Sequence, residues 1–227
     1  MNATAIPMMD TVTLPVAGDS PFPVGRVFCV GRNFAAHARE MGHDPDREPP
    51  FFFCKFADAV NTLKEVPYPS ATEDLHPECE MIVALSKGGA NIKEADALNH
   101  VFGYGVGFDM TRRDMQGEAK KMGRPWALSK GFDYAAPCSV LHKASEVGHV
   151  DKGTIRFTVN GEVRQESTMD KLIWSVPETI SFLSGLISLR PGDIIMTGTP
   201  EGVSAVQRGD TLVGHVDGLT DLEIKVV

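Results

Sequence analysis

The stretch His76-Pro77-Glu78-Cys79-Glu80 runs directly into the apolar segment Met81-Ile82-Val83-Ala84-Leu85. We interpret it as a strand, in which period-2 alternation points His76, Glu78 and Glu80 to one face. Two like charges this close are costly to bury unless a cation joins them, and a hard divalent ion with oxygen ligands is the simplest such cation. The alternative is an exposed strand whose two glutamates face water.

A second strand is indicated by Phe102-Gly103-Tyr104-Gly105-Val106-Gly107-Phe108, in which glycines alternate with larger residues. This spacing misses the G-x-G-x-x-G pattern that binding of a dinucleotide pyrophosphate requires. The glycines would instead let another backbone approach closely, and the strand would deliver Asp109 at its end. Asp109 could join a site there, or it could cap the helix that starts near Thr111.

That helix carries Arg113 and Gln116 three residues apart and one turn beyond Asp109, so a site at Asp109 would face both. Beside a metal, an arginine and an amide are suitable donors for a substrate carboxylate or a developing oxyanion. Further along, Lys130 could be a Schiff-base nucleophile, an anion clamp or a solvated side chain. The residues alone favour the solvated lysine.

Residues 34–41 are rich in alanine and charged residues, and Asn33 and Gly42 flank them as suitable helix ends. On this helix His37 and Glu40 share a face, so the carboxylate could orient the imidazole and raise its basicity. An ordinary surface pair is the alternative, and spacing alone favours it.

The rest of the chain indicates many short strands and few helices. Residues 51–56 predict a buried strand, from which Lys55 would extend toward solvent or meet an anion, with the first as the default. Asn160-Gly161 predicts a hairpin between residues 154–159 and 162–166. The capping box at 175–178 predicts a helix reaching about Leu186. Because strands and helices do not alternate, we expect a mixed, strand-rich α+β domain.

Composition excludes several classes of protein. The chain has 227 residues, 42% of them hydrophobic, which suits one catalytic domain over 24–227 after an extended arm over 1–23. The net charge of −8 argues against a nucleic-acid partner. Four widely spaced cysteines indicate neither a zinc knuckle nor disulfides. Without a charged secretory start or a membrane-spanning apolar run, we expect a cytoplasmic protein with no membrane partner.

Taken together, these residues resemble the fumarylacetoacetate hydrolase superfamily, in order and approximate spacing, from Arg26 to the C-terminus. The matching residues are Gly31-Arg32-Asn33-Phe34 with His37 and Glu40, Glu78 and Glu80, Asp109, Arg113-Asp114 with Gln116, Lys130 and Gly198-Thr199-Pro200 with Gly202. Residues 36–42, 44–55 and 124–126 are most similar to the bacterial branch that hydrolyses fumarylpyruvate in gentisate breakdown. Phe56, Pro77 and Cys79 depart from the usual pattern, which bears on substrate preference.

The resemblance implies a β-sandwich roll, a homodimer, and one Mg²⁺ or Mn²⁺ held by Glu78, Glu80 and Asp109. It implies that His37 and Glu40 activate water from a lid segment at about 33–50. The remaining site residues would be the catalytic Lys130 and the substrate-binding Arg113, Gln116 and Thr199.

The implied activity is cleavage of a carbon–carbon bond in a small anionic 2-oxo acid that carries a second oxo group, that is, a 2,4-dioxo acid. The favoured substrate is fumarylpyruvate, which would give fumarate and pyruvate. A Lewis-acid metal would let the pyruvate part depart as an enolate. Within the superfamily the alternatives are hydrolysis of other acylpyruvates, oxaloacetate decarboxylation and isomerisation of a 2-oxo-diacid. Outside it they are a non-catalytic dicarboxylate binder and a Schiff-base aldolase built on Lys130.

Overall fold

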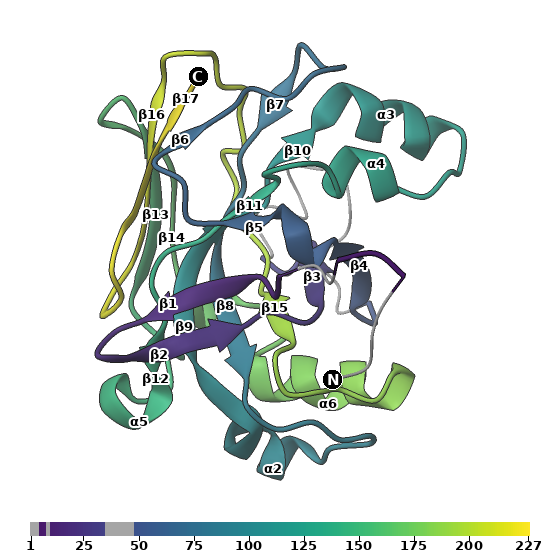
Figure 1. Cartoon of the computed structure of the whole chain (residues 1–227), viewed down its shortest axis with the longest axis vertical. Coiled ribbons are helices and arrows are strands. Elements are labelled where there is room, and N and C mark those ends of the chain that lie inside the picture. Colours follow the sequence, from purple (N-terminus) through teal and green to yellow (C-terminus); the bar gives the residue numbers. More distant parts are fainter. Residues whose placement is uncertain (1–4, 8–9, 35–47) are drawn as a thin grey trace.

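Two β-sheets form the centre of the molecule, and the computed structural model in Figure 1 describes residues 5–7, 10–34 and 48–227 of the chain. Within these residues the larger sheet has six strands. In spatial order they are β12 (His142–Lys143), β9 (Val101–Phe108), β8 (Cys79–Leu85), β15 (Ile194–Met196), β3 (Val27–Gly31) and β4 (Phe51–Lys55). β8 is antiparallel to both β9 and β15, whereas β15 runs parallel to β3.

The central pair of this sheet, β8 and β9, is tightly packed. All seven residues of β8 are buried, as expected for a strand covered on both faces. A Cβ on Gly103 of β9 would lie 2.1 Å from the carbonyl oxygen of His142, and one on Gly107 would lie 2.8 Å from Cδ1 of Ile82. The predicted role of these glycines, close approach of another backbone, is confirmed at Gly103, whereas Gly107 makes room for a side chain.

The second sheet has five strands in the described part of the chain. In spatial order they are β14 (Glu162–Thr168), β13 (Thr154–Val159), β16 (Thr211–Val216), β17 (Leu222–Val226) and β6 (Glu65–Val66). β13 and β14 form the predicted hairpin. Asn160 and Gly161 between them have φ angles of 52° and 84°, as a type I′ turn requires.

The two sheets pack face to face through large apolar side chains. The rings of Phe108 in β9 and Phe157 in β13 meet with centroids 5.3 Å apart at an interplanar angle of 67°. Gly214 of β16 lies against them, since a Cβ there would be 2.9 Å from the Phe108 ring and 3.0 Å from Cys79 Sγ. Each such buried side chain stabilises the fold by roughly 1.5–3 kcal/mol. This packing fixes the start of β8 and the end of β9.

The N-terminal segment differs from the extended arm expected over residues 1–23. β1 (Thr13–Val16) and β2 (Asp19–Pro23) pair as a hairpin on the other face of the six-stranded sheet. Leu14 is fully buried, and the Phe22 ring lies 5.1 Å from that of Phe102. Proline misled the prediction, because an edge ribbon tolerates residues that cannot donate a backbone hydrogen bond.

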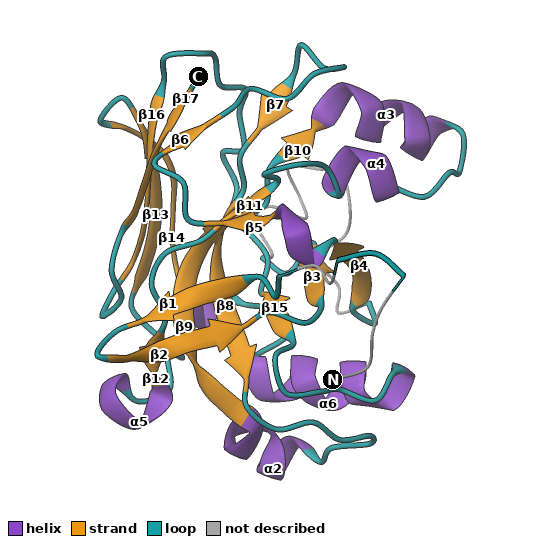
Figure 2. Ribbon diagram, in the orientation of Figure 1, coloured by secondary structure: helices purple, strands orange, loops and turns teal. Residues whose placement is uncertain are grey.

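Helices lie at both ends of the six-stranded sheet (Figure 2). α3 (Arg113–Lys121) and α4 (Ala127–Lys130) lie at one end, and α2 (Glu94–Ala97) and α6 (Val176–Leu186) at the other. α6 begins with the predicted capping box of Ser175 and Glu178. The other short elements are η1 (Ala57–Ala59), β5 (Val60–Asn61), β7 (Leu75–His76), η2 (Leu98–His100), β10 (Thr111–Arg112), β11 (Ala136–Pro137), α5 (Ala144–Val147) and η3 (Met169–Lys171). The strand-rich α+β fold is as predicted.

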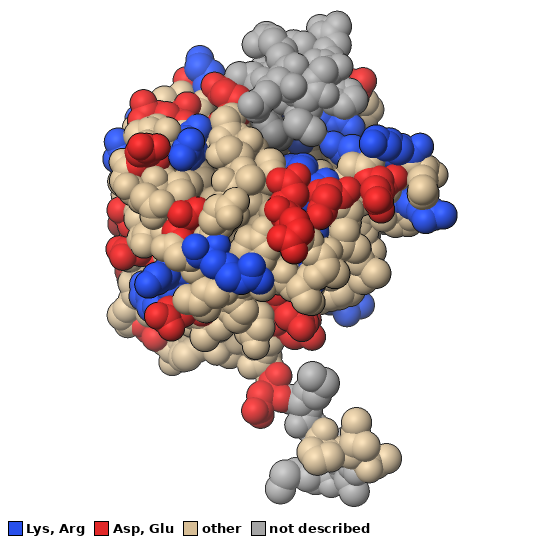
Figure 3. Space-filling view, turned by 90° about the horizontal axis from the view of Figure 1, so that it is seen from above, with Lys and Arg blue, Asp and Glu red and all other residues tan. Residues whose placement is uncertain are grey.

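The surface carries mixed charge. On the face shown in Figure 3, both acidic and basic side chains are present, and several acidic side chains lie together right of the centre of the view. Among the described residues, none of the helices combines the length and the apolar character needed to cross a bilayer.

Candidate active site

Three buried carboxylates meet where β8 begins and β9 ends. Glu78 and Glu80 stand at the start of β8, and Asp109 follows β9 directly. The backbone brings them together, because Cys79 pairs with Phe108 and the Asp109 amide donates to the Glu78 carbonyl at 2.9 Å. One carboxylate oxygen from each of the three acids lies within 4.8 Å of the others. The strand alternation and the position of Asp109 thus produce one acidic cluster.

His76 does not join the cluster, although strand alternation placed it on the same face. It belongs to the separate strand β7, which ends before Pro77, and its Nε2 atom lies 2.8 Å from Asp74 Oδ1. Burial and the nearby Arg113 lower the pKa of His76, so its neutral form is favoured.

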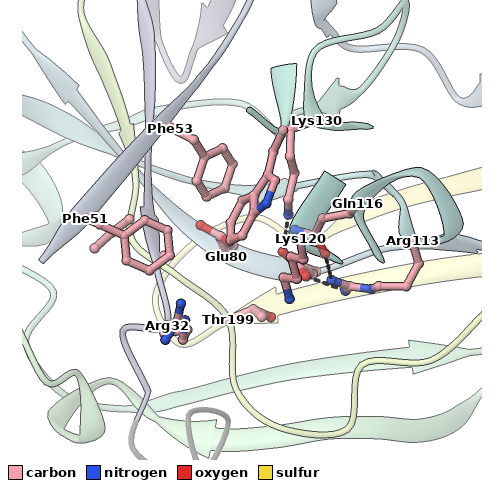
Figure 4. A pocket seen from close by; sticks show the side chains of 13 residues that line it. Arg32, Phe51, Phe53, Glu80, Arg113, Gln116, Lys120, Lys130 and Thr199 are labelled. Carbon is pink, nitrogen blue, oxygen red and sulfur yellow. Dashed lines mark hydrogen bonds and ion pairs between the residues drawn. The ribbon is translucent and has the colours of Figure 1, made fainter. Parts of the chain in front are cut away.

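Three cations compensate two of the acids. Lys130 Nζ donates to Glu78 Oε2 and to Asp109 Oδ2, both at 2.6 Å. Lys55 Nζ lies 2.7 Å from Asp109 Oδ1, and Arg113 Nη2 lies 2.5 Å from Glu78 Oε1. Figure 4 shows Lys130 and Arg113 converging on this side of the site. Glu78 and Asp109 therefore each have two ion-pair partners.

Glu80 is the exception. In the described part of the chain no lysine or arginine forms an ion pair with it, and its Oε2 atom accepts a hydrogen bond from the Gly198 amide at 2.7 Å. Burial, followed by the charges of Asp109 and Glu78, raises the pKa of Glu80 well above its ordinary range. Burial alone would also raise the pKa of Glu78, but Lys130 and Arg113 outweigh it and lower that pKa. Among the described residues, the cluster therefore lacks a cation paired with Glu80.

These donors fit a hard divalent ion. All three ligand groups are carboxylates, and oxygen ligands are what Mg²⁺ and Mn²⁺ prefer. A divalent ion would favour the ionised form of Glu80, which burial otherwise opposes.

Lys55 and Lys130 are buried, contrary to what the sequence alone favoured. Their exposed fractions are 3% and 2%. Lys55 Nζ also donates to the carbonyl oxygens of Met110 and Lys130, at 3.0 and 2.5 Å. Burial lowers the pKa of Lys130, but Asp109 and Glu78 outweigh this effect and raise it, so Lys130 stays charged. The default expectation of a snorkelling Lys55 is wrong, and the alternative, that Lys55 meets an anion, is confirmed by its ion pair with Asp109.

A small cavity of about 30 Å³ opens beside the cluster (Figure 4). Six predicted site residues line it, namely Glu78, Glu80, Arg113, Gln116, Lys130 and Thr199. Arg113 Nη1 donates to Gln116 Oε1 at 2.7 Å, so α3 presents the two as one unit. The predicted dyad of His37 and Glu40 lies outside the described residues.

Aromatic side chains form the opposite wall of the cavity. Trp126 lies edge-on to Phe51 and Phe53, with ring centroids 5.6 and 5.8 Å away. The Phe53 ring is also 4.8 Å from Lys130 Nζ. A second cavity of about 570 Å³ shares these three rings, Arg32 and Lys130 with the first, so the two adjoin. Together they offer a polar end for an acid group and an apolar extension.

Sequence reasoning missed Gln165, which connects the two sheets at the site. Its Nε2 atom donates to Thr199 Oγ1 at 2.8 Å and to the Pro200 carbonyl at 2.7 Å, and its Oε1 atom accepts from the Cys79 amide at 3.1 Å. A signal existed, since alternation in β14 puts Gln165 on the face opposite the charged Arg164 and Glu166.

Asn33 was predicted to cap a following helix, and its side chain has another role. Asn33 Nδ2 donates to the carbonyls of Trp174 and Thr197, at 2.9 and 2.8 Å, and its Oδ1 atom accepts from the Trp174 amide at 2.7 Å. Asn33 therefore connects the chain just after β3 to the loop that carries Thr199.

Comparison with known proteins agrees with this geometry. Residues 26–227 match the family described as fumarylacetoacetate (FAA) hydrolase, C-terminal. A fumarylpyruvate hydrolase from Ralstonia sp is 41% identical over 189 residues, 82% of this chain and 98% of that protein. The mitochondrial oxaloacetate tautomerase FAHD1 of Homo sapiens is 38% identical over 200 residues, 88% and 90% of the two chains.

A solved structure is similar over almost the whole chain. The crystal structure of fumarylpyruvate hydrolase from Pseudomonas aeruginosa, in complex with Mn²⁺ and pyruvate, superposes with a TM-score of 0.97, at 53% identity and covering 99% of each chain. The resemblance first noted in the ordered motifs is thus confirmed, and this chain belongs to the fumarylacetoacetate hydrolase family.

Proposed function

We propose that this protein is a metal-dependent hydrolase that cleaves the carbon–carbon bond of fumarylpyruvate and releases fumarate and pyruvate. One observation carries the proposal: Glu80 is buried beside two other carboxylates and forms no ion pair with any described lysine or arginine. The fumarylpyruvate hydrolases among its relatives support the choice of substrate.

Glu78, Glu80 and Asp109 would hold the metal, Mg²⁺ or Mn²⁺. When bound, the ion supplies Lewis-acid stabilisation for the enolate that departs from the cleaved bond. Lys130 then has two roles in the protein itself. Its ammonium group neutralises the acids, as its bonds to Glu78 and Asp109 indicate, and it offers a donor to the oxyanion that forms when water adds to the distal carbonyl.

Substrate orientation would come from α3 and from the Thr199 loop. Arg113 and Gln116 present hydrogen-bond donors to the cavity, and Thr199 lies 3% exposed at its floor. An arginine held in this way suits a carboxylate, here that of the 2-oxo acid end.

His37 and Glu40 would activate the attacking water. The segment that carries them joins Arg32 to Phe51, and both of these residues line the cavity. The water oxygen would end in fumarate as the bond between carbons 3 and 4 breaks, and a proton would return to carbon 3 of pyruvate. If His37→Ala hydrolysed fumarylpyruvate at the parent rate, this role would be wrong.

A substrate panel tests the proposal. We expect fumarylpyruvate to be hydrolysed with a higher kcat/KM than maleylpyruvate, acetylpyruvate or oxaloacetate, and only with added Mg²⁺ or Mn²⁺. Fumarate and pyruvate should form in equal amounts. Hydrolysis that continues unchanged in a strong chelator would contradict it.

Oxaloacetate tautomerisation is the second candidate. The named activity of the FAHD1 relatives favours it, and an acidic metal site suits any reaction through an enol. Rapid interconversion of oxaloacetate tautomers without loss of carbon, with no cleavage of fumarylpyruvate, would support this activity over hydrolysis.

The assembly and setting expected from the sequence belong to the proposal as well. We infer a homodimer that works in the cytoplasm in the breakdown of aromatic compounds. Sedimentation of the purified protein at the mass of two 24.6 kDa chains would support the dimer.

A further inference from the structure

Two cations that line the small cavity have no carboxylate partner in the described part of the chain. Among the described residues neither Arg32 nor Lys120 forms an ion pair, whereas Arg113 and Lys130 in the same lining are both paired. Arg32 is half-buried and Lys120 is exposed, which places them toward the mouth of the cavity. Figure 4 shows both side chains among those that line this cavity, with Arg32 near Thr199 and Lys120 drawn close to the end of Lys130.

Aromatic rings hold these two side chains in place. The Arg32 guanidinium carbon lies 4.9 Å from the centre of the Phe51 ring, and Lys120 Nζ lies 5.2 Å from that of Trp126. The two rings contact each other edge to face, at 5.6 Å and 80°. Because each cation lies over its own ring and the two rings contact each other, cation–π interactions fix the positions of Arg32 and Lys120 relative to each other.

The backbone of Arg32 supports a functional role. Its φ angle is +56°, in the left-handed region that residues with a Cβ rarely adopt. Such conformations persist where the surroundings enforce them, and they gather at ligand sites. Partial desolvation, followed by the charges of Arg113 and Arg32, also lowers the pKa of Lys120, although the charge of Glu78 opposes this effect.

Helix α3 relates this pair to the proposed substrate site. Arg113, Gln116 and Lys120 are spaced i, i+3 and i+7, so they lie along one face. Seven residues of helix span about 10 Å. Flexible side chains at the two ends of that span could hold the two ends of one extended small molecule.

We infer that Arg32 and Lys120 bind the carboxylate at the far end of the substrate, so that the enzyme selects 2-oxo acids with a second, terminal carboxylate. The inference rests on the proposed function, in which Arg113 faces the 2-oxo acid end. Fumarylpyruvate has a carboxylate at each end of a seven-carbon chain, and acetylpyruvate has only one. Arg32 and Lys120 thus explain a preference for an anionic acyl group.

The test uses two ligands that differ in one group. 2-Oxoheptanedioate and 2-oxoheptanoate have equal length, and only the first has the terminal carboxylate. Neither has the second oxo group, so neither is cleaved. Their dissociation constants, measured by calorimetry with Mg²⁺ present, should differ by about tenfold or more in the parent protein, because charged hydrogen bonds are the strong ones. In Lys120→Gln and in Arg32→Gln the ratio should fall toward one.

Lys121→Gln is the matched control, because Lys121 is the next residue of α3, is exposed and does not line the cavity. It should keep the parent ratio, and circular dichroism should show that all variants are folded. Equal affinity for the two ligands in the parent protein, or an unchanged ratio in both cavity variants, would overturn the inference. A collapse of the ratio only in Arg124→Gln would also overturn it, since Arg124 lines the outer cavity.

This binding test is independent of turnover. If the parent protein binds the diacid more tightly but does not cleave fumarylpyruvate, the inferred subsite is supported and the proposed function is refuted. If the protein cleaves fumarylpyruvate but binds both ligands equally, the proposed function is supported and the inferred subsite is refuted.

Discussion

The two sheets have similar apolar cores but differ in how they treat buried polar groups. The six-stranded sheet buries Glu80 and Lys55 within its own strands and presents Asp109 at the end of β9. In the strands of the five-stranded sheet, Gln165 is the one buried polar residue among those the structure describes. That residue is the one that reaches the site.

This difference indicates that the two sheets have different roles. Burying charge in the six-stranded sheet costs desolvation free energy, and this cost is offset only if cations and a ligand compensate the charge. The five-stranded sheet supplies apolar packing and holds its charges in water, as His215 with Asp217 and Asp221 illustrates. Substitutions should therefore affect function in the first sheet and, with one exception, only stability in the second.

Glu80→Gln should have the largest effect. The amide keeps the size of the side chain and can still accept from the Gly198 amide, but it removes one charge from the proposed metal ligands. We expect fumarylpyruvate hydrolysis to fall by about a thousandfold, which corresponds to about 4 kcal/mol of transition-state stabilisation. Steady-state kinetics with saturating Mn²⁺ measure it. Near-parental activity would mean that Glu80 is not a ligand.

Lys55→Met should have the second-largest effect, a loss in the free energy of unfolding. Its ion pair with Asp109 is completely buried, and breaking such a pair destabilises by about 3–5 kcal/mol. Lys143→Met is the control at the opposite edge of the same sheet, where the ion pair with Glu146 is partly exposed. Its loss should be below about 1 kcal/mol. Urea denaturation of both variants gives the comparison, and equal losses would contradict the contrast between buried and exposed charge.

Gln165→Met tests the exception in the five-stranded sheet. The variant leaves the buried Cys79 amide without its partner, at an expected cost of about 1–3 kcal/mol. It also removes one of the two hydrogen bonds that hold the Thr199 hydroxyl, so kcat should fall more than the lost stability explains. Gln207→Met, at an exposed position, is the control. A variant that loses stability but keeps kcat would make Gln165 purely structural.

His215→Gln should have the smallest effect, and one that depends on pH. Burial lowers the pKa of His215, but its hydrogen bonds to Asp217 and Asp221 outweigh this and raise it above 6.5. Its stabilisation is thus complete below pH 6.5 and is lost as the pH rises through the folded-state pKa. Tm should fall by about 1–3 °C at pH 5.5 and stay unchanged at pH 9.

His142→Gln is the matched control for this comparison, because His142 bonds the hydroxyl of Thr220 at 2.8 Å and no carboxylate. Its effect on Tm should be the same at both pH values. A drop for His215→Gln that is larger at pH 9 would reverse the assigned sign.

Local signals in the sequence were sufficient for much of the fold. The Asn160-Gly161 turn, the capping box at Ser175 and the alternating glycines of β9 were read correctly, since each depends on near neighbours in the chain. The pairing that brings Asp109 beside Glu78 followed from two strands that were each predictable.

The remaining features depend on contacts that no local pattern contains. Lys55 is buried because Asp109, far along the chain, needs a cation, and Leu14 is buried because a distant sheet face is open to it. The resemblance supplied the set of candidate ligands, but only the structure distinguishes Glu80 from its paired neighbours. Gln165 was visible in the strand alternation, yet nothing nearby marked its partners.

The central claim is that Glu78, Glu80 and Asp109 together hold one divalent ion. Crystals of the parent protein and of Glu80→Gln soaked in Mn²⁺ test it directly, because manganese is located by its anomalous scattering. We predict one peak per chain in the parent protein, within coordination distance of an oxygen from each of the three carboxylates, and none in the variant. A peak at another place, or an equal peak in both proteins, would contradict the claim.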